Sequence, residues 1–308
     1  MLGFITLRAF ESLIVLLIMS FLIYGLIGLM PGDPIDEMIA ANPNLTSEDI
    51  ARLKGLHGLD KPLLDRYVNW LAAAFAGDFG FSRIHSRPAI EILSSHLINT
   101  LKLMTAAIVL SLSIAFPLGI LAAAKPNSVL DHAINFSSFI SISVPPFWLA
   151  LLAIIVFSVK LGWLPAGGMG IAGDGSTDNL RYIILPVGVL TLLNTGSYIR
   201  FIRASMIQVL RQDFIRTARA KGASTTQLLI NHALRNAALP FITVIALSFG
   251  SLFSGALITE TMFSWLGLGK MIFDSVLGND FNLALVGLLL ATLMTLIGNI
   301  LADAAYAW

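Results

Sequence analysis

Cysteine is absent from this chain of 308 residues, and charged side chains are scarce. Without cysteine the protein has no disulfide, no cysteine-ligated iron–sulfur cluster and no thiolate metal site, while its compartment stays undecided. Only 12% of the residues are charged and 56% are hydrophobic, with a mean hydropathy of +0.84. Charged side chains make up about a quarter of an ordinary soluble domain. The composition therefore argues against a soluble domain and indicates a membrane protein.

Six stretches carry no charged side chain for long enough to cross a bilayer, which takes about 20 residues of apolar helix. They are about 18 to 27 residues long, well beyond the average of about 11–12 for helices of soluble proteins. The sequence therefore predicts an all-α membrane protein with six transmembrane helices. The six stretches are Ser12–Gly32, Leu103–Ala124, Ala133–Val159, Tyr182–Ile199, Asn236–Thr259 and Phe281–Ala302.

Prolines lie in the interior of four of these six stretches, apart from Pro31 at the very end of the first. Each proline removes a helical hydrogen bond and permits a kink, which neighbouring helices or water can compensate within a membrane. Kinked helices suit a bundle that opens and closes, and they are equally compatible with static packing. The prolines are Pro117, Pro145, Pro146, Pro186 and Pro240.

The distribution of Lys and Arg between the spans predicts the orientation. Residues 200–235 hold seven basic side chains against the single acid Asp213, which indicates the cytoplasmic side. Because the chain alternates sides, both termini are then cytoplasmic, and residues 31–96, 160–181 and 260–280 lie outside. The first span is longer than the apolar core of a signal peptide, about 7–15 residues, and no small-x-small cleavage site follows it. It is therefore predicted to be an uncleaved anchor.

The long outer connection between the first two spans is predicted to fold. A helix start is indicated at Thr46–Asp49, and Tyr67–Leu71 forms an apolar-faced segment that suits the membrane interface. About 65 residues form only a small core, which favours a cap that packs on the helices over a separate enzymatic domain.

The cytoplasmic connection is the most informative segment of the chain. Residues Gln212–Lys221 are predicted to form an amphipathic helix, because Phe214, Ala218 and Gly222 recur four residues apart. Small residues at this spacing let another backbone come close, and Gly222 suits a left-handed helix cap. A second short helix is predicted at Thr225–Asn236. On charge alone, this basic double-helix loop suits either docking onto another protein or contact with anionic lipid.

Motifs along nearly the whole chain resemble those of one known family. They include Arg216-Thr-Ala-Arg-Ala-Lys-Gly222 and His232-Ala-Leu-Arg-Asn-Ala in the cytoplasmic connection. Others are Met30-Pro-Gly-Asp-Pro, Arg203-Ala-Ser-Met206 and Glu260-Thr-Met-Phe-Ser-Trp-Leu-Gly-Leu-Gly269. Their shared order resembles that of the permeases of type I ABC importers, specifically the dipeptide, oligopeptide and nickel branch. The family usually has proline in the place of Leu266, so a looser turn is expected there.

The resemblance implies that the cytoplasmic connection, at about residues 200–235, docks into ATPase subunits. The implied architecture is an N-terminal transmembrane helix with its outer loop at 1–96, followed by an importer core of five helices at 97–308. The implied partners are two ATP-binding subunits, an extracytoplasmic solute-binding protein and a second permease, either a related chain or a second copy of this one. The residues of the coupling loop are then Asp213, Phe214, Arg216, Thr217, Ala218, Arg219, Ala220, Lys221, Gly222 and Ala223.

No nucleotide or catalytic site is recognisable in the sequence. The pattern nearest to a phosphate-binding loop, at 170–177, has Ser176 where lysine is essential. The spacings of His57, His85 and His96 match no compact metal-ligand pattern. The resemblance therefore implies that partner ATPase subunits bind ATP and magnesium, and that this chain is not an enzyme and holds no cofactor or metal.

The function implied by the resemblance is a permease for dipeptides or oligopeptides in the bacterial cytoplasmic (inner) membrane, with no nucleic-acid partner. The same branch covers nickel complexes, glutathione, opines and oligosaccharides, which stay open as cargo. An ATP-independent secondary transporter or channel is the alternative from another class. Ion-coupled carriers usually have ionisable groups in mid-membrane, whereas those of this chain lie near the ends of the spans. The four charges concerned are Glu11, Lys102, Glu260 and Asp303.

Overall fold

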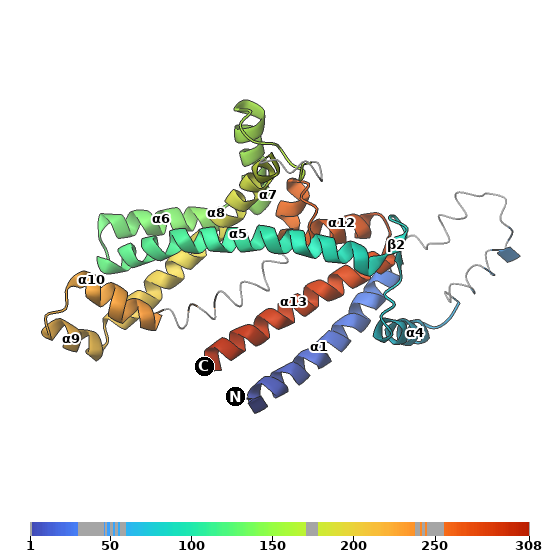
Figure 1. Ribbon diagram of the computed structural model, residues 1–308, viewed down its shortest axis with the longest axis horizontal. Helices are drawn as coiled ribbons and strands as arrows, with labels where there is room; N and C mark the ends of the chain where they lie inside the picture. The colour runs from blue at the N-terminus through green and yellow to red at the C-terminus, as the bar shows by residue number, and fades with distance from the viewer. Residues whose placement is uncertain are drawn as a thin grey trace. The chain divides into compact units, whose positions relative to one another are not determined.

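The structure is a computed structural model that describes residues 2–29, 60–170, 178–237 and 256–307, together with residues 46, 48, 49, 52, 55, 241 and 244. Within these residues the regular secondary structure is helical apart from one two-stranded hairpin (Figure 1). It divides into two compact units, which are described separately. Unit 1 comprises residues 98–270 and 295–308, and unit 2 comprises residues 2–97 and 271–294.

Most of the described elements are long helices. In chain order they are α1 (Leu2–Gly28), α4 (Leu63–Phe75), β1 (Phe81–Ser82), β2 (Arg87–Pro88), α5 (Ala89–Ala124), α6 (Val129–Ser143), α7 (Pro146–Ala153), the π-helical segment η1 (Ile154–Lys160), α8 (Asp178–Leu210), α9 (Asp213–Ala220), α10 (Thr225–Gln227), the π-helical segment η2 (Leu228–Leu234), α12 (Leu268–Leu277) and α13 (Phe281–Ala307). Residues 256–262 are also helical.

Four helices are long and apolar enough to cross a membrane, and they coincide with the predicted first, second, fourth and sixth spans. They comprise Thr6–Gly28, Ala89–Ala124, Leu180–Leu210 and Phe281–Ala304. Two of them extend well beyond their charge-free stretches, since α5 begins 14 residues before Leu103 and α8 continues 11 residues beyond Ile199. A charge-free stretch identifies only the part of a helix that suits the bilayer. The helix itself extends further, through residues with charged and polar side chains.

The predicted third span is not one straight helix. It consists of α6 and of α7 with η1, which are bent by 98° relative to each other. The break follows from two consecutive prolines, because a residue before proline is driven out of the helical region. Val144 and Pro145 accordingly have ψ angles of 127° and 135°. Most of the predicted fifth span, Asn236–Thr259, lies outside the described residues, so the structure confirms four spans and one bent pair.

Helices α5, α6 and α7 all pack against α8 in unit 1 (Figure 1). Two glycines bring helix backbones close together. A Cβ atom on Gly119 of α5 would lie 2.7 Å from Ile202 Cγ2 of α8, and one on Gly196 of α8 would lie 2.5 Å from the Ser138 carbonyl oxygen of α6. Such close approach is typical of helix contacts in membranes, where van der Waals packing replaces the hydrophobic effect.

A buried glutamate holds the N-terminus of α12 in unit 1. Glu260 is fully buried, and its carboxylate accepts hydrogen bonds from the Thr100 hydroxyl (2.5 Å) and the Lys270 amide (3.1 Å). The Thr100 hydroxyl in turn accepts from the Leu268 amide (2.7 Å). Burial raises the pKa of the Glu260 carboxyl, and these hydrogen bonds oppose that effect. The first amides of a helix have no partner within that helix. In α12 they donate instead to Thr100 of α5 and to Glu260, which directly follows the predicted fifth span.

The turn around Leu266, where the missing proline led us to expect a looser turn, is held by several hydrogen bonds. The Leu266 amide, which a proline would lack, donates to Met169 Sδ (3.3 Å), and the Leu266 carbonyl accepts from the Asn99 side chain (2.9 Å). The Trp265 indole donates to the Asn99 carbonyl (3.2 Å). Only glycine fits at 267, where a Cβ atom would lie 2.1 Å from Glu260 Oε1.

In unit 2 the outer connection packs on α1 through aromatic side chains. Tyr67 of α4 is buried, and its hydroxyl lies 2.7 Å from the Ser20 hydroxyl of α1. The Tyr67 ring makes edge contacts with Phe21 and Tyr24. Further upstream, Thr46 and Asp49 exchange hydrogen bonds, which confirms the predicted helix start locally.

The hairpin of unit 2 is fixed by one buried aspartate. Asp280, at the start of α13, accepts hydrogen bonds from the Ser82 hydroxyl (2.5 Å) and the Ile84 amide (3.1 Å). It also accepts from the Leu283 amide (3.3 Å) and so caps α13. The same carboxylate therefore starts a helix and holds a hairpin almost two hundred residues earlier in the chain.

A pair of glycine substitutions in α8 tests the close approach of α6. Gly196→Ala is expected to lower stability by about 1–3 kcal/mol, because the new methyl group overlaps the Ser138 carbonyl. Gly188→Ala is the matched control, since nothing lies within 4 Å of its added Cβ, and it is expected to be neutral or to stabilise by about 0.5–1 kcal/mol. Thermal melting followed by circular dichroism in detergent measures both. Equal melting temperatures for the two variants would contradict the packing described.

Candidate functional site

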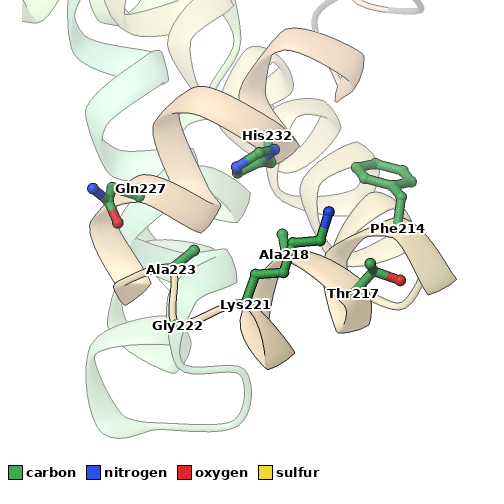
Figure 2. A pocket seen from close by; sticks show the side chains of 8 residues that line it. All are labelled: Phe214, Thr217, Ala218, Lys221, Gly222, Ala223, Gln227 and His232. Atoms are coloured by element: carbon green, nitrogen blue, oxygen red, sulfur yellow. The ribbon is translucent and has the colours of Figure 1, made fainter.

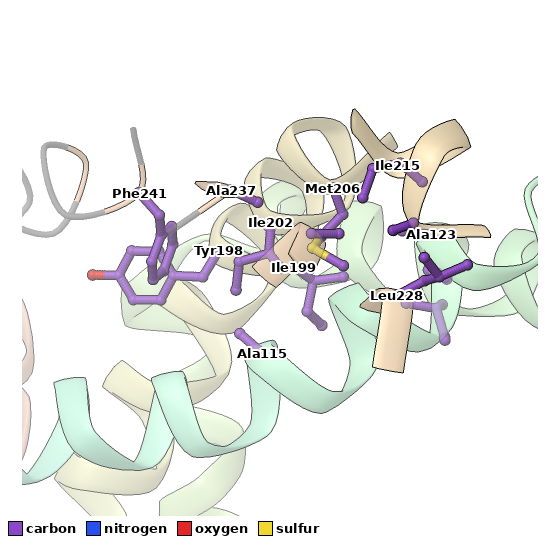
Figure 3. Close-up of a cluster of buried hydrophobic side chains, with 14 residues drawn as sticks. Ala115, Ala123, Tyr198, Ile199, Ile202, Met206, Ile215, Leu228, Ala237 and Phe241 are labelled. Atoms are coloured by element: carbon purple, nitrogen blue, oxygen red, sulfur yellow. The ribbon is translucent and has the colours of Figure 1, made fainter. Parts of the chain in front are cut away.

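The amphipathic helix predicted at Gln212–Lys221 is α9, which begins after two residues that follow the end of α8. It buries Ile215 and Ala218. Both side chains belong to a cluster of buried apolar residues that includes Met206 of α8 and Leu228 of η2 (Figure 3). The prediction that Phe214, Ala218 and Gly222 share the apolar face is therefore corrected. The buried face of α9 contains Ile215 and Ala218, which are three residues apart. The Phe214 side chain is 39% exposed.

The end of α9 is fixed by a Schellman motif, which confirms the predicted left-handed cap at Gly222. The Gly222 amide donates to the Arg219 carbonyl (3.0 Å), and the Ala223 amide donates to the Ala218 carbonyl (3.2 Å). Gly222 has a φ of +87°, a conformation that only glycine adopts without cost. The helix therefore ends at a defined residue, and the chain reverses toward α10.

The second helix of the connection begins at Thr225, as predicted, with a capping box. The Ser224 hydroxyl accepts from the Gln227 amide (3.3 Å), and the Gln227 side chain accepts from the Ser224 amide (2.9 Å). The helix then continues as the π-helical segment η2. The end of α9 and the start of α10 are thus both held by hydrogen bonds, which gives the turn between the two helices a defined structure.

An open groove of about 500 Å³ lies between α9 and the segment formed by α10 and η2 (Figure 2). Its lining combines apolar side chains with polar and basic ones. Six of the ten residues predicted for the coupling loop line it: Phe214, Thr217, Ala218, Lys221, Gly222 and Ala223. The other four, Asp213, Arg216, Arg219 and Ala220, lie on α9 but do not line the groove.

Two further residues of the groove, Gln227 and His232, were not among the predicted coupling residues. The Lys221 and His232 side chains extend into the space between the two helices (Figure 2). The signal for Gln227 was its place three residues after Ser224, the spacing of a capping box. His232 begins a motif that the sequence showed, but its direction depends on the π-helical turn, which sequence periodicity does not reveal.

The surface of the loop is basic. The only acid among residues 200–235, Asp213, pairs with Arg216 one turn later (3.2 Å), and both side chains are largely exposed. Exposed pairs of this kind contribute little stability. Arg219 and Lys221 are exposed as well, so the loop presents positive charge at and around a groove of mixed apolar and polar lining. Such a surface suits a protein partner that carries acidic side chains.

A buried ion pair lies close to the loop. Arg203 of α8 donates from Nε and Nη2 to the two carboxylate oxygens of Asp131 on α6, at 2.5 and 2.6 Å. The Asp131 side chain is 1% exposed, and that of Arg203 is 24% exposed. The sequence indicated Arg203 only as part of a motif and gave no signal for Asp131, because the two residues are 72 positions apart.

Long apolar helices, one of them continuing into a structured basic loop, define a multi-span membrane protein. The chain belongs to the family described as the binding-protein-dependent transport system inner membrane component, which matches residues 115–308. The N-terminal part of the same kind of transport component matches residues 1–114. The fold is thus the all-α transmembrane domain of type I ABC importers, in the peptide branch of that family.

Two relatives match over the full length of the chain. The oligopeptide transport system permease protein AppB of Bacillus subtilis (strain 168) is 36% identical over 310 residues, covering 100% of this chain and 98% of AppB. The glutathione transport system permease protein GsiC of Escherichia coli (strain K12) is 34% identical over 307 residues, covering 100% of this chain and 97% of GsiC.

Substitution of Gly222 tests the end of α9. Gly222→Ala is expected to cost about 1–2 kcal/mol, because alanine resists the left-handed backbone, and to speed amide exchange in residues 213–223 by roughly 5- to 30-fold. Gly222→Asn is the control, since asparagine tolerates that conformation. Hydrogen exchange read by mass spectrometry distinguishes the two variants. If alanine and asparagine gave the same exchange as glycine, the cap would not define the loop.

Proposed function

We propose that this chain is a permease subunit of an ATP-driven ABC importer and forms part of the pathway by which peptides cross the bacterial cytoplasmic membrane. Full-length similarity to an oligopeptide permease is the observation that carries the proposal. The similarity to the GsiC permease favours glutathione, itself a short peptide, as the second candidate cargo. Domain limits at 1–96 and 97–308 remain part of the proposal.

The proposed mechanism is alternating access driven from the cytoplasmic loop. Helix α9 docks on an ATPase subunit, and ATP-dependent closure of two such subunits displaces it. Because Ile215 and Ala218 pack in one cluster with Met206 of α8, the displacement reaches α8 directly. Packed interfaces move between discrete arrangements, so α8 transmits the shift to the membrane helices that pack on it.

The basic side chains of the loop supply the attraction to the ATPase. Arg216, Arg219 and Lys221 are proposed to face acidic side chains of that subunit, and the open side of Gly222 permits close approach of its backbone. ATP and magnesium are bound by the ATPase subunits in this proposal, and this chain supplies no catalytic group.

The remaining partners follow from membership in the family. A second permease, related or identical, completes the pathway, and an extracytoplasmic solute-binding protein delivers the cargo. In the proposed orientation both termini and the coupling loop are cytoplasmic, while residues 31–96, 160–181 and 260–280 face the binding protein. The positive charge of residues 200–235 supports this orientation.

Removing the three bases of the loop tests the docking surface. The triple change Arg216→Ala, Arg219→Ala and Lys221→Ala is expected to weaken association with the ATPase subunits about tenfold, since each exposed pair contributes roughly 0.2–1 kcal/mol. Copurification at increasing salt measures the association. Lys125→Ala, at an exposed lysine between α5 and α6, is the control and is expected to bind normally. Equal binding by the triple variant and the wild type would refute the docking role.

Reconstitution tests the transport function itself. The chain is purified with its partners from native membranes, placed in liposomes and assayed for ATP hydrolysis with the binding protein empty, loaded with a dipeptide or loaded with glutathione. Stimulation by a loaded binding protein is expected, and the better stimulator identifies the cargo. Solute flux through the chain alone, without ATP, would replace the proposal with a channel or secondary carrier.

A further inference from the structure

Helices α6 and α8 contact each other at four successive levels along α8. The Asp131–Arg203 ion pair forms the first level, nearest the coupling loop. At the next level the Arg200 guanidinium lies 4.5 Å from the centre of the Phe139 ring. The close backbone contact at Gly196 follows, and finally a hydrogen bond from the Ser141 hydroxyl to the Leu192 carbonyl.

The ion pair is the strongest of these contacts. Its two nearly parallel hydrogen bonds are bidentate, the geometry that gives arginine and carboxylate both strength and direction. Asp131 is further oriented by the Asn127 amide (2.8 Å) and by the Asn135 side chain (2.7 Å). The carboxylate thus has four donors, and its position in the first turn of α6 is also favoured by the helix dipole.

The ion pair is also part of the body to which the coupling helix is attached. Ile202 and Met206 flank Arg203 on α8, and Ile134 follows Asp131 by one turn on α6. All three side chains lie in the buried cluster that contains Ile215 and Ala218 of α9 (Figure 3). Movement of α9 is therefore applied to α8 beside Arg203.

A buried ion pair is rarely selected for stability alone, because desolvation of the two charges offsets much of their attraction. Its directional hydrogen bonds do, however, fix two helices in one register. We propose that Asp131 and Arg203 are positioning residues, which make α6 and α8 move as one arm when the coupling loop is displaced. This inference rests on the proposed function of the loop. It extends that function to α6, a helix that is not adjacent to α9 in the sequence.

Single substitutions of the pair separate positioning from folding. In Asp131→Asn the Arg203 guanidinium remains partly hydrated, whereas Arg203→Gln leaves a buried carboxylate short of two donors, so the second variant is expected to melt at the lower temperature. The double variant pairs two amides and is expected to regain stability. Lys125→Gln is the matched control, because it removes one positive charge at an exposed lysine between α5 and α6 and leaves the described contacts between α6 and α8 in place.

The first readout is ATP hydrolysis by the full importer in lipid, as the ratio between loaded and empty binding protein. Both single variants and the double variant are expected to lose stimulation roughly 3- to 30-fold while the ATPase subunits still copurify. Lys125→Gln is expected to stay within about twofold of the wild type. Recovery of stimulation together with stability in the double variant would show a purely structural pair and overturn the inference. An equal loss in Lys125→Gln would overturn it as well.

The second readout needs no ATPase. Amide hydrogen exchange of the chain alone in lipid nanodiscs is expected to rise in residues 213–220 for both single variants, because α9 loses its fixed support, and to stay unchanged in Lys125→Gln. Unchanged exchange in every variant would overturn the positioning role while leaving the proposed transport function intact. Absence of ATPase binding by the wild-type chain would instead overturn the transport function, and the exchange result would still decide whether the pair supports the loop.

Discussion

Close packing of α5, α6 and α7 on α8 is the constraint on which the rest of unit 1 depends. In a membrane the apolar surface of a helix gains little by leaving lipid, so shape and polar contacts decide how helices associate. Small residues at positions such as Gly119 and Gly196 bring the backbones together, and polar contacts then fix their register. Only two residues separate the end of α8 from the start of α9. The proposed coupling loop is therefore attached directly to the packed helices.

Rigid ends distinguish the coupling loop from an ordinary connection. The Schellman motif at Gly222 and the capping box at Ser224 satisfy amides and carbonyls that helix ends otherwise leave to water. A flexible loop would absorb a displacement by changing its own shape. In the proposed mechanism, a loop with these two capped helix ends, and with Ile215 held in a buried cluster, passes the displacement to α8.

Much of this structure follows from local patterns in the sequence. Charge-free stretches located four spans, the spacing of small residues around Gly222 indicated the helix cap, and two consecutive prolines marked a possible break in the third span. What the sequence did not show depends on partners far apart in the chain. Nothing near Asp131 indicates Arg203, and nothing near Glu260 indicates that Thr100 shares its hydrogen bonds. The π-helical turn at His232 was also hidden, since it has no distinct residue pattern.

Asp280 and the hairpin of unit 2 have a consequence for biosynthesis. Ser82 and Asp280 are 198 residues apart, and a ribosome needs about 10–40 seconds to add that many residues. During this interval the hairpin has been made but the carboxylate that holds it has not. Unit 2 therefore completes its fold only when nearly all of the chain has been synthesised. Until then, its early segments lack the aspartate that holds the hairpin.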